Sequence, residues 1–189
     1  MKYTSNLLVL LVCAASLLAQ AQTAGSSPAA AHATPTKDPV ASSVRTLLQR
    51  SRNNTLGALS AMPADKYDYK PTADQMTFAH LAVHIIGFNN SFCAKAADVA
   101  EPKVEEAKET DGKDKLLAEA TASYDFCSEA LGKMDDSKLG DSIEIFGGRQ
   151  APRAMASLIL ASGWADHYAA AAQYLRLNGI LPPSAQPKK

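Results

Sequence analysis

Four long segments, in which apolar residues recur every three or four positions, restrict this chain to a helical fold. This spacing places the apolar side chains along one face of an α-helix. The segments cover residues 39–62, 77–99, 113–134 and 152–179. Pro63 ends the first, Thr77 is a suitable N-cap for the second, and Pro152 suits the first turn of the fourth. The stretch SIEIFGG, at 142–148, can be extended but is too isolated to build a sheet. We therefore predict an all-α four-helix bundle.

The N-terminal residues have the three-part layout of a secretory signal. Lys2 precedes an apolar run at 7–19, and the small residues at positions 19 and 21 match the pattern before signal cleavage sites. The run is too short to span a bilayer permanently. Cys13 does not favour lipid attachment, because Val12 stands where a small residue is required. We expect residues 1–21 to be a cleaved signal peptide.

The remaining chain is expected to have three parts. Residues 22–37 are mostly Ala, Ser, Thr and Pro with little to bury, which is typical of a flexible tether. Residues 38–184 hold the bundle as one domain, and residues 185–189 form a C-terminal tail. The protein should therefore be periplasmic or secreted, and free of the membrane after signal cleavage.

The charge balance limits the kinds of partner. The chain has 19 basic and 19 acidic residues, and 47% of its residues are hydrophobic. This balance provides no basic footprint for nucleic acid and no attraction to a membrane surface. We expect the partner to be a small molecule, and a homodimer is compatible with this composition.

Two cysteines carry information about topology. An exported chain keeps Cys93 and Cys127, which in an oxidising compartment are more often bridged than free, although two buried thiols are the alternative. They lie ~24 Å and ~21 Å along the second and third helices at ~1.5 Å per residue. A disulfide needs Cα atoms within about 7 Å. A bridge therefore requires the second and third helices to run parallel, with a crossover between them.

Three parts of the sequence together resemble the exported members of the DinB/YfiT-like superfamily. They are MPADKYDYKPTADQMTFAHLAVHIIGFNNSFC at 62–93, FGGRQAPRA at 146–154 and DHYAAAAQYLRLNGILPPS at 166–184. The residues in register with the family pattern are Pro71, His84, Asn89, Cys93, His167, Tyr168 and Gly179. The resemblance implies an up-down-down-up bundle, with a divalent metal held by three histidines. Through this resemblance, the relatives of the chain include metal-dependent thiol transferases that act with low-molecular-weight thiols such as bacillithiol and mycothiol.

The chain matches only part of the implied ligand set. His84 corresponds to the ligand from the second helix, and His167 to the second of two ligands from the fourth. The other ligand should stand one turn before His167, where this chain has Gly163. Both histidines lie on apolar stripes, so we expect them to point into the bundle, as metal ligands or as hydrogen-bonded core residues.

His80 is the candidate replacement for the missing ligand. Histidines four residues apart on one helix face are a recognised way to chelate zinc or nickel. Alternatively, His80 is a half-exposed residue of the first helical turn. Asn89, Asp166 and Tyr168 are candidates for the groups that surround and orient the ligands.

Two functions follow from these residues. The first is a metal-dependent transferase or hydrolase that holds zinc or nickel in the bundle core. A low-molecular-weight thiol is one candidate substrate. The second is a non-catalytic binding or structural module in which the metal triad has decayed. In that case, Gly163 would open a small apolar pocket beside Trp164.

Overall fold

A computed structural model describes residues 35–187 of the chain. Within them are four long helices, as predicted, and each predicted bound lies within two residues of the observed one. The helices are α1 (Pro39–Ala61), α2 (Phe78–Ala97), α3 (Lys113–Gly132) and α4 (Ala154–Leu177). The predicted signal peptide and most of the predicted tether lie outside the described residues. Within residues 35–187, no helix is both long and apolar enough to cross a membrane.

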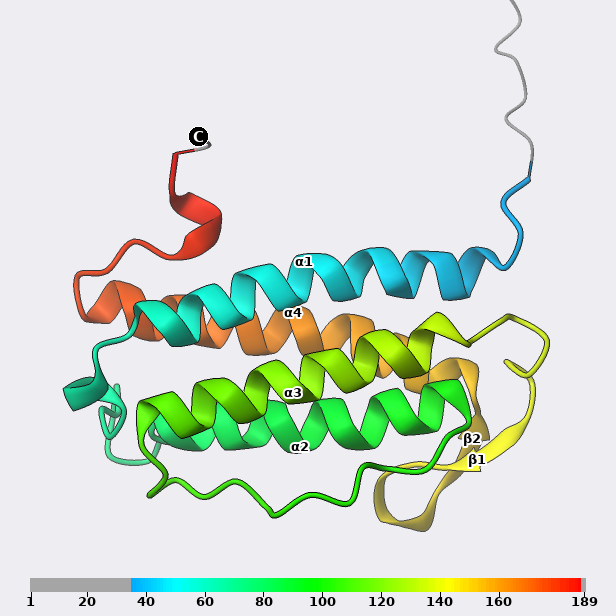
Figure 1. Ribbon diagram of the computed structural model, residues 1–189, viewed down its shortest axis with the longest axis horizontal. Helices are drawn as coiled ribbons and strands as arrows, with labels where there is room; N and C mark the ends of the chain where they lie inside the picture. Colours follow the sequence, from blue (N-terminus) through cyan, green and yellow to red (C-terminus); the bar gives the residue numbers. More distant parts are fainter. Residues whose placement is uncertain (1–34, 188–189) are drawn as a thin grey trace, which may run out of the picture. The chain divides into compact units, whose positions relative to one another are not determined.

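The helices follow an up-down-down-up course. In Figure 1, α1 and α4 run in one direction while α2 and α3 run in the other, and the linker at 98–112 returns alongside α2. Cys93, late in α2, is bonded to Cys127, late in α3, and their Cα atoms are 5.2 Å apart. The predicted disulfide and the predicted parallel pair of helices are both present.

Side chains from the loops and caps hold the helix ends in place. The backbone N–H groups of Val40 and Ala41, which have no partner inside α1, donate to the carboxylate of Asp136 at 2.9 and 2.8 Å. The predicted N-cap, Thr77, accepts a hydrogen bond from the backbone N–H of His80 at 2.9 Å. A loop before α4 thus fixes the start of α1.

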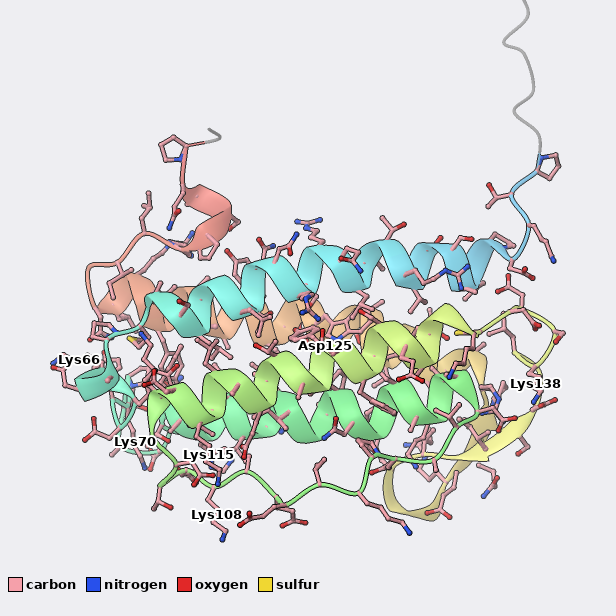
Figure 2. All side chains as sticks on the ribbon, viewed as in Figure 1. Lys66, Lys70, Lys108, Lys115, Asp125 and Lys138 are labelled. Carbon is pink, nitrogen blue, oxygen red and sulfur yellow. A yellow bond between two sulfur atoms is a disulfide. The ribbon has the colours of Figure 1, made fainter. Side chains whose placement is uncertain are left out.

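A buried arginine fastens the end of α2 to the start of α4. Asp98 ends α2 in the left-handed conformation, with φ at 58°. It accepts hydrogen bonds from Arg153 at 2.8 Å and from Lys138 at 2.6 Å, and these partners lower the pKa of its carboxyl. Arg153 also donates to the carbonyl of Lys95 at 2.6 Å. Figure 2 shows Lys138 at this end of the bundle.

The connection between α3 and α4 forms a small sheet, so the prediction that it was too isolated to do so is wrong. Strand β1 (Ser142–Glu144) pairs antiparallel with β2 (Gln150–Pro152). The turn between them contains Gly147 and Gly148, whose φ angles of 63° and 79° suit glycine. The second strand overlaps the segment predicted as the fourth helix only at Pro152, and its other two residues show no pattern that predicts a strand.

The core lies between all four helices and is mostly aliphatic. Its largest fully buried apolar side chains are Phe78, Leu48, Leu59, Met62, Ile85, Leu116, Leu131, Leu160 and Leu175. Charged side chains lie outside this core, and Figure 2 shows Lys66, Lys108 and Lys115 on the outside of the bundle. Burial of this apolar set drives the packing of the helices.

Candidate functional site

The structure brings His84 of α2 and His167 of α4 side by side. Their ring centroids are 4.8 Å apart and the ring planes are nearly perpendicular, at 88°. His167 is partly buried, but His84 is exposed, which corrects the expectation that it points into the core. The buried face of α2 is centred on Ile85 and Asn89. His84 therefore lies on the flank of that face, where α2 meets the edge of α4.

The environment of His167 favours a neutral imidazole. Burial and, to a smaller extent, the neighbouring His84 lower its pKa to about 4, while the carboxylate of Asp166 acts in the opposite direction. Among the described residues, the buried Nδ1 atom of His167 has no hydrogen-bond partner. At neutral pH the ring is therefore uncharged, which is the form that binds metal ions.

The space for the third histidine of the family pattern is occupied by Phe88. A Cβ atom built on Gly163 would come 2.3 Å from Cζ of Phe88, far closer than atoms approach without rearrangement. The Phe88 ring also packs edge-to-face against His167, with centroids 4.6 Å apart. The expected apolar pocket at Gly163 is thus filled by Phe88. A histidine at position 163 does not fit unless that ring moves.

His80 has a different partner. Its Nδ1 lies 2.6 Å from Oε1 of Glu109 in the linker before α3, and Thr77 donates to the same carboxylate at 2.9 Å. The hydrogen bond from His80 is the largest cause of a lowered pKa at Glu109. His80 thus ties the linker to the first turn of α2. Within residues 35–187, no three His, Cys, Asp or Glu side chains are arranged to hold a metal ion.

The three residues expected to surround the ligands have separate surroundings. Asn89 is buried, where its Oδ1 accepts from Nε1 of Trp164 at 2.9 Å and its Nδ2 donates to Oγ of Ser123 at 3.1 Å. Asp166 is exposed and acts on His167 through its charge. Tyr168 donates from its hydroxyl to Ser184 at 2.6 Å, which fixes the C-terminal segment. Asn89 therefore links three helices in the core.

The sequence analysis missed the role of Phe88. Phe88 falls on the apolar stripe predicted for α2, and Gly163 was interpreted as a lost ligand or as the opening of an apolar pocket beside Trp164. Two signals were present: a large aromatic residue one turn after His84, and the smallest residue on the facing helix. Such a pair indicates close approach of a ring to a backbone. Pairing Phe88 with Gly163 requires knowing that the two residues lie at the same level along the bundle axis, and the structure supplies this.

Comparisons with known proteins support the fold. A family model described as the DinB superfamily matches residues 47–168, a range that includes both His84 and His167. A DinB-like protein from Bacillus subtilis is similar in structure, with a TM-score of 0.61 and 20% identity, over 77% of this chain and 99% of that one. A DinB-like protein from Bacillus cereus has a TM-score of 0.59 and 17% identity, over 72% of this chain and 93% of that one. No curated protein matches the chain. The chain belongs to the DinB superfamily.

Proposed function

We propose that this protein is a non-catalytic, DinB-like binding module in which the three-histidine metal centre has decayed. The observation that carries the proposal is the contact between Phe88 and Gly163. A ring stands where the side chain of the third ligand would enter. Structural and catalytic zinc sites in proteins use at least three protein ligands. The pair His84 and His167 supplies two.

The position of the Phe88 ring is supported from both sides. It packs against His167 at a centroid distance of 4.6 Å and against Phe92 at 5.0 Å. Aromatic pairs of this kind contribute about 0.5–1.5 kcal/mol each beyond their buried area. Moving the ring to admit a third ligand therefore has a cost. The packing favours an aromatic contact between α2 and α4 over a metal centre.

A metal-dependent transferase or hydrolase is the second candidate function. The observation in its favour is the proximity of His84 and His167, with centroids 4.8 Å apart and His167 held neutral by burial. Zinc or nickel would be the metal and a low-molecular-weight thiol a possible substrate. Because the described residues provide two of the three required nitrogens, no reaction step is assigned to them.

We also propose that the protein is exported. The bond between Cys93 and Cys127 supports this location, because disulfides persist mainly in oxidising compartments. The N-terminal sequence pattern points to the same route. Fractionation of cells that express the full chain tests this part independently of the metal question.

Elemental analysis of exported protein without an affinity tag distinguishes the two functions. The binding-module proposal predicts zinc and nickel well below one equivalent. The His84→Ala variant should lose whatever remains, while the His80→Ala control should retain it, because His80 is bound to Glu109. A full equivalent of metal in the wild type that disappears in His84→Ala would establish the metalloprotein instead.

A further inference from the structure

A second concave site lies between α1 and α4, away from the histidine pair. It is a pocket of about 190 Å³. Its apolar walls are Leu47 of α1 together with Ala161, Trp164 and Ala165 of α4. Ala161 and Ala165 are one helical turn apart, so two small side chains leave room where larger ones would close the gap. His167 projects from α4 toward α2 instead.

A buried hydroxyl at the wall of this pocket has a hydrogen to donate. Ser51 is 6% exposed, and its Oγ lies 2.8 Å from the hydroxyl of Tyr124. Burial raises the pKa of Tyr124, so that group stays a phenol. Either hydroxyl of the pair can be the donor. When Tyr124 donates to Oγ of Ser51, the hydrogen of Ser51 is available to a group inside the pocket.

A cation also borders the pocket. Arg50 is exposed and contributes to the lining. Within the described part of the chain, no carboxylate lies within 4.0 Å of its guanidinium, whereas Arg52, two positions later, pairs with Asp125 at 2.6 Å. Asp125 is labelled on α3 in Figure 2. The charge of Arg50 is therefore available to a ligand.

We propose that this pocket binds a small monocarboxylate with a compact aromatic or aliphatic body. The apolar walls, including the indole of Trp164, receive the body of the acid, and burial of its apolar surface favours binding. Arg50 and Ser51 bind the carboxylate through charge-assisted hydrogen bonds. The volume is below that of pockets for drug-sized ligands, so short acids fit the site. The proposal concerns a site that a metal at His84 and His167 would not touch.

Fluorescence of the protein tests this directly, because Trp164 is the chain's one tryptophan and forms part of the pocket wall. Titration with benzoate should give a saturable change in emission, and benzamide, which lacks the charge, should bind at least tenfold more weakly. Arg50→Gln should weaken benzoate binding at least tenfold. Arg149→Gln, which removes an exposed arginine at the β1–β2 hairpin, should leave it unchanged.

A second pair of variants tests the pocket itself. Ala165→Leu fills the space and should abolish the benzoate signal, while Ala169→Leu, at another exposed alanine of α4, should preserve it. Both positions are exposed, so both variants should keep the helical circular dichroism signal. Absence of a saturable signal in the wild type, equal losses in the two arginine variants, or full binding by Ala165→Leu would each overturn the proposal.

Discussion

Phe88 of α2 lies so close to Gly163 of α4 that a Cβ atom at position 163 would come within 2.3 Å of its ring. This contact sets how near the two helices approach beside His84 and His167. The glycine in α4 thus serves the packing of a ring, which offsets its low helix propensity of about 1 kcal/mol relative to alanine.

Stability measurements should detect this dependence. Gly163→Ala should lower the free energy of unfolding by about 1–3 kcal/mol through overpacking, less the gain in helix propensity. Phe88→Ala alone should also destabilise, but the double variant should be more stable than the sum of the two changes predicts. Urea unfolding of the four proteins measures this coupling.

Gly87 is the matched control for that cycle. It lies inside a helix, as Gly163 does, but in α2, where it is exposed and has no atom within 4 Å of the position that a Cβ would take. Gly87→Ala should therefore stabilise the protein by about 0.5–1 kcal/mol. If Gly163→Ala stabilises the protein as much as Gly87→Ala does, the proposed close packing is absent.

Removal of the disulfide should weaken the bundle without unfolding it. The bond joins residues 34 positions apart, for which the chain-entropy model gives about 3–4 kcal/mol. Both sulfurs are fully buried, so a Cys93→Ala/Cys127→Ala variant is a cleaner test than a reductant. We expect the melting temperature to fall by about 10 °C with the helical signal retained. An unchanged melting temperature, or two free thiols in exported wild-type protein, would contradict the assignment.

Acid should destabilise the protein partly through His167. Its pKa is about 4 in the folded state and 6.5 when the residue is unperturbed, so the unfolded chain binds more protons between these values. The contribution of the neutral His167 to the free energy of unfolding is therefore intact above about pH 6.5 and is lost as the pH falls toward 4. The loss is about 2 kcal/mol after allowance for partial exposure.

A variant isolates this contribution from the titration of the carboxylates. His167→Phe keeps an aromatic ring beside Phe88 and cannot be protonated. Its free energy of unfolding should fall less than that of the wild type between pH 7 and pH 4. Parallel pH profiles for the two proteins would show that His167 binds its proton in the folded state as readily as in the unfolded chain, which would contradict the lowered pKa.

The buried amide of Asn89 should matter more than its neighbour on the same helix. Asn89→Ala leaves the indole N–H of Trp164 without its acceptor and Ser123 without its donor. We expect a loss of about 2–4 kcal/mol in the free energy of unfolding. Asn90→Ala, at a partly exposed position, should change it by less than about 0.5 kcal/mol. Equal effects would remove the structural role of Asn89.

The architecture could be predicted because the sequence alone shows helical periodicity and the positions of the two cysteines along their helices. Four helices, the bounds of each and the parallel pair joined through Cys93 and Cys127 all followed from them. The hairpin was missed because its second strand, at 150–152, is three residues long and directly precedes α4. A strand this short leaves no periodicity to read.

The candidate site was less predictable because its contacts depend on helix heights and rotation. The stripe that includes Ile85 gave the buried face of α2, but not that His84 lies on its flank. Nothing in the local pattern around His80 indicated Glu109, which lies 29 positions away and approaches through the linker. Pairs of this kind become visible only when the separate elements are packed together.

The most direct test of the central claim is a comparison of zinc affinity, measured by competition with a chelator of known affinity. The proteins compared are the wild type, Gly163→His and Phe88→Ala/Gly163→His. We expect weak binding by the wild type and no gain in Gly163→His, because the new side chain meets the Phe88 ring. The double variant, which has both the ligand and the space, should bind at least tenfold more tightly and lose that gain when His84 is also changed to Ala. Wild-type protein that binds one zinc ion as tightly as the double variant would contradict the loss of the three-histidine centre.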